Sequence, residues 1–356
     1  MELVDFRHFP LWLNLAVFAA TAAAVWLTGT RLTRQTEEIA QRTGVGRAFA
    51  GLLLLGGVVS LPELSTATSA ALTGNARFAI NTLLGGIAAT MVTIAVIDAV
   101  VRERPLSTDI THPVVLLQGA LSVLFLVVAA AGIVVGDVPV FGVGAWSLAL
   151  LALYLLFANL IRHYEWHRAW IPEEDVRRRG GRAARPEPAE GQEGRPHGRR
   201  VPAGLLLATM GVAVATAGTG FLLSRLGDAI AEQTGLGASF AGLLLGGIVT
   251  SLPEASTIYS AVRIRRFELV FSDAYGSNLF STMAICIADL AFPGGPILNE
   301  VGRFGLFAVL LGAAVSAIFL AGCLERRNRL FLGMGVDSFL VLCAYGGGLI
   351  FLIHLR

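Results

Sequence analysis

One stretch of this chain occurs twice at a fixed spacing, and its content restricts the fold more than any other feature. Residues 43–70 have the sequence TGVGRAFAGLLLLGGVVSLPELSTATSA, and residues 234–261 have the sequence TGLGASFAGLLLGGIVTSLPEASTIYSA. An offset of 191 residues aligns the two copies without a gap and places Ser60-Leu61-Pro62-Glu63 on Ser251-Leu252-Pro253-Glu254. Each copy therefore carries a carboxylate and a proline in the middle of an apolar, glycine-rich segment.

The polar groups of these copies suit a hard cation. A carboxylate deep in an apolar segment is costly, so it indicates a functional site. Proline removes one backbone N–H and its ring clashes with the carbonyl four residues earlier, which frees backbone oxygens nearby. Such a carbonyl, the Glu63 carboxylate and the hydroxyls of Ser60, Ser65 and Thr66 are oxygen ligands for Na⁺, Ca²⁺ or a proton. Paired interrupted hydrophobic segments in two halves of a chain are typical of a transporter's binding site.

The composition is that of a polytopic membrane protein. The chain is 55% hydrophobic and 15% charged, whereas a soluble domain carries roughly 25% charged residues. Its net charge of +2 gives no support for nucleic-acid binding. Since a membrane helix needs about 20 apolar residues, we expect ten spans, at 11–29, 48–72, 78–101, 114–135, 140–161, 202–223, 239–262, 269–292, 303–322 and 332–353.

One long hydrophilic segment divides the chain. Residues 162–201 are rich in arginine, acids, proline and glycine, which predicts a flexible linker. It joins a first half, 1–161, with its repeat at 43–101, to a second half, 202–356, with its repeat at 234–292. Five helices per half is an odd number, so the second half enters the membrane from the opposite side. The expected fold is an all-α integral membrane protein of ten transmembrane helices in two inverted five-helix repeats.

The placement of arginine predicts the orientation. Arginines cluster in the loops after expected spans 1, 3, 7 and 9, whereas the loops on the other side hold single arginines. By the positive-inside rule the clustered loops and the linker are cytoplasmic, and both termini lie outside. The expected location is a plasma membrane of the bacterial (inner-membrane) kind.

The doubled S-L-P-E-[LA]-S motif, the later Gly276-Ser277-Asn278 and the five-plus-five helix count resemble the cation/calcium exchanger superfamily, the sodium/calcium exchanger type of membrane antiporter. In that family the glutamates of the two repeats bind the transported ions, which assigns this role by resemblance to Glu63 and Glu254. The resemblance also implies a set of further oxygen ligands: Ser60, Ser251, Thr250, Ser277 and Asn278, with the carbonyls around Gly56 and Gly247.

The first repeat departs from the family pattern. The offset places Gly85-Gly86-Ile87 opposite Gly276-Ser277-Asn278, so its serine and asparagine are absent. Four residues beyond that serine, members of the family typically carry an acid or an asparagine as a ligand, and here those positions are Thr90 and Ser281. Because the number of charged ligands tunes calcium affinity, we expect weaker Ca²⁺ binding than in a typical member.

Three other acids align with the repeats. Asp273, opposite Thr82, is a candidate to replace some of the missing charge. Asp98 and Asp289 match each other across the offset and lie near the ends of their expected spans, which favours a helix-end or interfacial role over a gate.

We therefore expect a secondary active antiporter that exchanges Ca²⁺, or a related cation, for Na⁺ or H⁺ by alternating access. The resemblance implies that spans 1 and 6 slide against the other helices. Two alternatives stay open, a proton-coupled exchanger of the monovalent cations Na⁺ or K⁺ and a transport-dead sensor of the same fold. The expected partners are inorganic cations and the lipid bilayer, with no cofactor. An intramembrane hydrolase using Ser277 or Ser251 is disfavoured because no histidine falls within a span near either serine, so we do not expect an enzyme.

Overall fold

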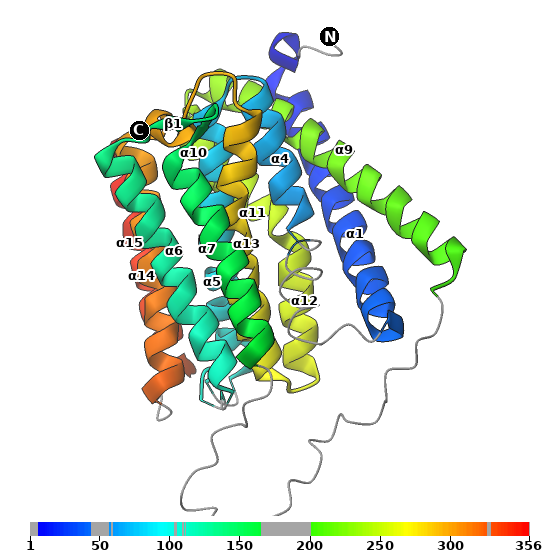
Figure 1. Ribbon diagram of the computed structural model, residues 1–356, viewed down its shortest axis with the longest axis vertical. Helices are drawn as coiled ribbons and strands as arrows, with labels where there is room; N and C mark the ends of the chain where they lie inside the picture. The colour runs from blue at the N-terminus through cyan, green and yellow to red at the C-terminus, as the bar shows by residue number, and fades with distance from the viewer. Residues whose placement is uncertain are drawn as a thin grey trace, which may run out of the picture.

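A bundle of helices forms the molecule, and two long helices, α1 (Leu11–Thr43) and α9 (Ala203–Thr234), lie side by side along one edge of it (Figure 1). This computed structural model describes residues 6–43, 57, 60–102, 105–108, 110, 112–164, 201–325 and 329–355. Both marked termini lie at the same end of the bundle, whereas α9 begins at the opposite end. The expectation that both termini lie outside stays a prediction.

The first half contains η1 (Phe6–His8), α1, α4 (Leu61–Leu72), α5 (Ala76–Val101), α6 (Pro113–Val135), β1 (Pro139–Val140), β2 (Val143–Gly144) and α7 (Ala145–Tyr164). The second half contains α9, α10 (Ala238–Ala241), η3 (Gly242–Gly246), α11 (Gly247–Thr250), α12 (Leu252–Arg263), α13 (Phe267–Ala291), η4 (Ile297–Glu300), α14 (Gly302–Glu325), β3 (Leu330–Phe331), β4 (Met334–Gly335) and α15 (Val336–Leu355).

The 191-residue offset relates far more than the doubled motif. It maps α4 onto α12 at both ends, the first residue of α5 onto that of α13, and the first residue of α7 onto that of α15. It also maps both strands of the β1–β2 hairpin onto those of the β3–β4 hairpin. In Figure 1, α4 occupies the upper part of the bundle and α12 the lower part, so the matched helices extend toward opposite ends.

The two hairpins correct the start of two expected spans. Residues 140–161 and 332–353 were expected as continuous helices, but the helices begin at Ala145 and Val336. Before each helix lies a tight turn, in which Phe141 and Leu332 have φ values of 53° and 52° and are followed by a glycine that also has positive φ. Two successive positive φ angles are the geometry of a two-residue hairpin turn. Because these turns are apolar, a hydropathy count does not distinguish them from the start of a membrane span.

The main hydrophobic core is built around α5 and α13. Both helices are apolar on most of their circumference, and a helix of that kind is buried. Their largest fully buried side chains, which include Phe78, Phe271 and Tyr275, pack with Phe125 of α6 and Phe319 of α14. These four helices form the rigid frame against which the other elements lie.

The α1–α9 pair has a separate small core. Phe18 and Val25 of α1 pack with Leu223, Leu226 and Ile230 of α9, and Val249 of α11 joins them. Since this cluster is distinct from the main core, the pair is a unit that packs on the bundle from one side.

Two glycines related by the offset pack the α1–α9 pair against the bundle, but the residues that they contact are not related by the same offset. A Cβ placed on Gly29 of α1 would lie 2.3 Å from the Pro253 ring, and one on Gly220 of α9 would lie 2.7 Å from Ser65. Gly29 and Gly220 are related by the offset, but the counterpart of Pro253 is Pro62, three residues before Ser65. Because the two contacts shift in opposite directions along α4 and α12, the pair is displaced by half of this three-residue difference, about 2 Å, from a symmetric position, toward the end at which α4 stops.

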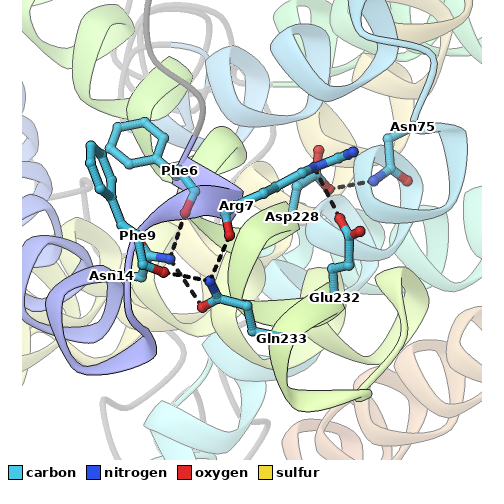
Figure 2. Close-up of polar contacts among 8 residues, drawn as sticks. All are labelled: Phe6, Arg7, Phe9, Asn14, Asn75, Asp228, Glu232 and Gln233. Carbon is cyan, nitrogen blue, oxygen red and sulfur yellow. Dashed lines mark hydrogen bonds and ion pairs between the residues drawn. The ribbon is translucent and has the colours of Figure 1, made fainter.

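Figure 2 shows polar contacts of the α1–α9 pair at the end of the bundle where α1 begins and α9 ends. Asn75, which caps α5, donates to Asp228 of α9, while Arg7 pairs with Glu232 at 2.9 Å. Gln233 of α9 donates to the Phe9 carbonyl at 2.7 Å and so holds the chain before α1. These contacts link η1, α1, α9 and the α4–α5 turn.

The described helices have the length and composition of a multi-pass membrane protein. Within the described residues, six helices are long and apolar enough to cross a membrane, and the bent segment from α10 to α12 makes a seventh if it counts as one span. α7 is a shorter apolar helix. The expected span at 48–72 lies partly outside the described residues, and the count of ten spans stays a prediction.

Candidate ion-binding site

The helix that leads to Glu254 is interrupted at Ser251. The segment from α10 through α11 ends at Thr250, and α12 continues from Leu252 at an angle of 44°. Because Pro253 has no N–H, the carbonyl four residues before it lacks its helical donor. The break thus leaves the Val249 carbonyl without its helical donor one turn before Glu254, as the proline predicts.

The first repeat has the same local geometry at its own Ser-Leu-Pro-Glu. Ser60 precedes α4 with φ −85° and ψ 12°, and Ser251 precedes α12 with φ −84° and ψ 4°. Glu63 and Glu254 then fall in the first turn of their helices. The partial positive charge of a helix N-terminus favours a carboxylate at this position.

Three oxygens from three helices converge at Glu254. The hydroxyls of Ser60 and Ser277 lie 2.9 Å apart, and each lies 3.4 Å from Oε1 of Glu254. The distances to the carboxylate are longer than an optimal hydroxyl–carboxylate hydrogen bond. The Glu254 cluster, Glu254 with Ser60 and Ser277, is therefore a loosely held set of oxygen atoms.

Glu63 has a different set of neighbours. The Ser251 hydroxyl lies 3.2 Å from Oε1 of Glu63 and also 2.8 Å from the carbonyl of Gly247 and 3.3 Å from that of Gly86. The Thr250 hydroxyl lies close to the same carboxylate and donates to its own helix at 2.9 Å. We call Glu63, Ser251, Thr250 and the Gly86 carbonyl the Glu63 cluster.

The two clusters form one site because each glutamate is contacted by the serine of the other repeat. Both carboxylates are buried, with Glu63 2% exposed and Glu254 1% exposed. Within the described residues, Oε2 of each glutamate has no hydrogen-bond partner. Burying an ionised carboxylate is very costly unless it is paired, so the arrangement suits a cation or a proton.

Glycine at two positions, Gly85 and Gly247, allows the helices to meet this closely. A Cβ on Gly247 would lie 2.4 Å from the Gly85 backbone, and one on Gly85 would lie 2.1 Å from the Leu243 carbonyl oxygen. α5 and the η3–α11 segment therefore cross backbone to backbone. This crossing brings Ser251 against Gly86 and explains Gly247 in the stretch before the second Ser-Leu-Pro-Glu.

The structure thus brings together most of the predicted ligands, namely Glu63, Glu254, Ser60, Ser251, Thr250, Ser277 and Gly247.

The other predicted ligands have different surroundings. Thr90 donates to the Gly86 carbonyl at 3.0 Å, and Ser281 is buried one turn beyond Ser277 in α13. Asn278 is buried, and within the described residues both polar atoms of its side chain lack a hydrogen-bond partner. Asp273 is bonded to Thr257 at 2.7 Å. The predicted carbonyl of Gly56 lies outside the described residues.

Sequence reasoning missed two members of the site region. Gly86 was treated only as a lost serine, yet its carbonyl accepts from both Ser251 and Thr90. Thr257 was not linked to Asp273, although its hydroxyl contacts both that carboxylate and the Glu254 carbonyl. The signal for Gly86 was present in the alignment of the repeats, because a backbone carbonyl survives the loss of a side chain.

Asp98 and Asp289 hold the two halves together at the helix ends. Asp98 accepts from the N–H groups of Leu106 at 3.0 Å and Gly335 at 2.7 Å. Asp289 accepts at 2.7 Å from the first residue of η4 and at 2.8 Å from the last residue of β2. Each aspartate thus binds one loop of its own half and the hairpin of the other half, which agrees with the expected helix-end role.

Comparison with known proteins identifies one family. The family described as "Sodium/calcium exchanger protein" matches residues 13–161 and 203–353. No curated protein sequence matches the chain.

Several solved structures share the fold. The sodium-calcium exchanger NCX_Mj aligns with a TM-score of 0.58 and 14% identity, over 96% of this chain and 99% of that chain. YfkE aligns with a TM-score of 0.63 and 15% identity, over 98% of this chain and 94% of its own. The H⁺/Ca²⁺ exchanger CAX aligns with a TM-score of 0.59 and 16% identity, over 96% of this chain and 82% of its own. These identities are low, so the likeness concerns the fold.

Proposed function

The chain belongs to the sodium/calcium exchanger family, and we propose that it is a secondary active antiporter that exchanges Ca²⁺ for Na⁺ or H⁺ across a membrane. The main observation behind this proposal is that the serine of each repeat contacts the glutamate of the other: Ser60 contacts Glu254, and Ser251 contacts Glu63. We call this the crossed pairing. A site shared by two repeats lies where both halves can expose it in turn.

Charge explains why such a site would exchange ions and not leak. Two buried carboxylates carry two negative charges if both are ionised, which one Ca²⁺, two Na⁺ or two protons neutralise equally. An empty site with two unneutralised carboxylates is costly in a closed, low-dielectric state. The site therefore changes sides only when it is loaded, and one ion must replace the other.

Alternating access follows from the displacement of the α1–α9 pair. In the present position Thr66 and Thr82, which lie between the site and the end of α4, are fully buried. Their counterparts Thr257 and Asp273, toward the end of α12, are only half-buried. We propose that a shift of the pair by about one helical turn, which places Gly220 at Pro62 and Gly29 at Ser256, opens the opposite path.

The proposed membrane arrangement has ten helices in two inverted five-helix halves, with residues 162–201 linking them on the cytoplasmic side. The opposite directions of α4 and α12 and the common end of the termini support it. Arg263 is the last residue of α12, and Arg265 and Arg266 lie between α12 and α13, so the positive-inside rule makes the end at which α12 stops the cytoplasmic one in this arrangement.

A flux measurement in proteoliposomes tests the proposal. Vesicles loaded with Na⁺ are diluted into ⁴⁵Ca²⁺, and the uptake is repeated with an outward H⁺ gradient in place of Na⁺. Uptake driven by either gradient, and lost in Glu254→Gln, supports antiport and identifies the coupling ion. No Ca²⁺ uptake under either gradient overturns the proposal.

The second candidate is proton-coupled exchange of Na⁺ or K⁺. It is favoured by the two clusters themselves, because the described side chains that hydrogen-bond Oε1 of each glutamate are neutral serine hydroxyls. A site with two carboxylates and neutral oxygens binds Ca²⁺ less tightly than one with more acids. Uptake of ²²Na⁺ or ⁸⁶Rb⁺ driven by a pH gradient, in vesicles that take up no Ca²⁺, distinguishes this function.

A further inference from the structure

The Asp273 carboxylate lies next to the candidate ion-binding site, on the side toward the end of α12. Asp273 lies in α13 four residues before Ser277, so the two side chains share a helix face one turn apart. Ser277 contacts Glu254, and the Asp273 carboxylate is therefore one turn from the Glu254 cluster, toward the end at which α12 stops.

Thr257 fixes Asp273 in that position. Its hydroxyl lies 2.7 Å from Oδ2 of Asp273 and 2.8 Å from the Glu254 carbonyl oxygen. Because the Thr257 hydroxyl is within hydrogen-bonding distance of both oxygens, it links the turn of α12 that carries Glu254 to the Asp273 carboxylate on α13. A single hydroxyl thus separates Asp273 from the backbone of Glu254, and a cation bound on this side would interact favourably with both acids.

The opposite side of the site has no such acid. The offset places Thr66 opposite Thr257 and Thr82 opposite Asp273, so two neutral hydroxyls stand where the other path has a hydroxyl and a carboxylate. Conformational change can exchange which path is open, but it cannot move the charge. The asymmetry is thus a fixed property of the sequence.

We propose that Asp273 and Thr257 form a first binding position for the transported divalent cation on one face only, the face at which α12 ends. This inference rests on the proposed exchange of Ca²⁺ at Glu63 and Glu254. A hard divalent ion that enters from this face exchanges part of its water shell for carboxylate and hydroxyl oxygens before it reaches Glu254. An ion that enters from the other face meets threonine hydroxyls, those of Thr66 and Thr82, at the equivalent positions.

The consequence is a difference in apparent affinity between the two faces. A carboxylate in a narrow, partly desolvated path raises the local concentration of cations, and this increases their rate of entry. The protein should therefore capture Ca²⁺ more effectively from the α12 face, which is cytoplasmic in the proposed orientation. This suits extrusion of a scarce ion.

The test measures the Ca²⁺ dependence of exchange separately from each face, in right-side-out and inside-out vesicles. Asp273→Asn removes the charge at nearly constant volume and should lower the apparent Ca²⁺ affinity at the α12 face by roughly 3- to 30-fold. At the opposite face it should stay within about twofold of the wild type. Asp273→Thr, which reproduces Thr82 of the other repeat, should give the same one-sided loss and guards against a folding defect of the first variant.

Glu268→Gln is the matched control. Glu268 lies in the first turn of α13, near the membrane face at which α12 ends. Its carboxylate accepts a hydrogen bond from the His112 backbone N–H at 3.1 Å, whereas the Thr257 hydroxyl bonds to Asp273. Glu268→Gln should change neither affinity, because surface charge alone is not the proposed cause.

The outcomes separate the inference from the function on which it rests. Equal losses at both faces would place Asp273 in the central site and overturn the inference, as would unchanged affinity at both faces in variants that exchange Ca²⁺ normally. A wild-type protein that exchanges no Ca²⁺ at all would instead overturn the proposed function.

Discussion

The hydroxyl of Ser251 lies 3.2 Å from Oε1 of Glu63, although 188 residues separate the two in the chain. The equivalent contact, Ser60 with Glu254, runs in the other direction between the repeats. Neither repeat therefore contains both partners of either contact, and the candidate site forms only when both halves pack together.

Removal of either crossed serine should weaken ion binding without unfolding the protein. Ser251→Ala and Ser60→Ala each delete a neutral oxygen ligand, at a cost of about 1 kcal/mol, or roughly a fivefold loss of apparent Ca²⁺ affinity. Concentration-dependent ⁴⁵Ca²⁺ uptake measures this loss. Ser260→Ala is the control, because that hydroxyl bonds within α12. Equal affinities of the Ser251 variant and this control would argue against the crossed pairing.

The adjacent glycines Gly85 and Gly86 of α5 should differ in what a serine substitution changes: Ca²⁺ affinity at Gly86 and stability at Gly85. A Cβ on Gly86 would lie 3.3 Å from the Ser251 hydroxyl and 3.4 Å from Oε1 of Glu63, which side chains can accommodate with small shifts. Gly86→Ser places a hydroxyl where the second repeat has Ser277 and should raise Ca²⁺ affinity several-fold. Gly85→Ser meets the Leu243 backbone and should lower the unfolding temperature.

Calcium titration of exchange and thermal unfolding in detergent measure these two effects. Unchanged or weaker Ca²⁺ binding in a folded Gly86→Ser protein would contradict the predicted geometry of the Glu63 cluster.

The two helix-end aspartates should affect stability more than transport. Asp289→Ala leaves two buried backbone N–H groups without an acceptor, and each costs about 1–3 kcal/mol. Asp98→Ala should be similar, because it removes the matched pair of bonds. Unfolding in detergent reports the loss, and exchange per folded molecule should stay near the wild-type rate. A stable Asp289→Ala protein without exchange would indicate a gate instead.

Movement of the α1–α9 pair is open to a cross-linking test. In a background without the three native cysteines, a cysteine pair at positions 65 and 220 should form a disulfide once α4 and α9 part by about 1 Å, because a Cβ on Gly220 would lie 2.7 Å from that of Ser65 and a disulfide needs about 3.5–4.5 Å. The disulfide should stop exchange while Ca²⁺ still binds from the α12 face, and reduction should restore exchange. Full exchange in the cross-linked protein would exclude the proposed shift.

The sequence predicts the site better than it predicts the segment boundaries. The Ser-Leu-Pro-Glu repeats identify both glutamates and the helix break at Ser251, because proline and a buried acid have consequences that hold in any context. The hairpin at Phe141 escaped prediction because its residues are apolar and resemble the start of a span.

Contacts between distant segments are the part that sequence reasoning does not reach. The offset shows that Gly86 replaces a serine, but only the crossing of α5 with the η3–α11 segment shows that its carbonyl accepts from Ser251. The pairing of Thr257 with Asp273 likewise depends on how α12 packs on α13.

The most direct test of a shared ion site is Ca²⁺ exchange by Glu63→Gln and Glu254→Gln, measured separately beside Glu300→Gln, an exposed acid outside the site. Each site variant removes one of two buried charges, so we predict that each reduces exchange by at least about 100-fold, while Glu300→Gln exchanges at the wild-type rate. Normal exchange with normal Ca²⁺ affinity in either site variant would contradict the account, because one repeat would then suffice.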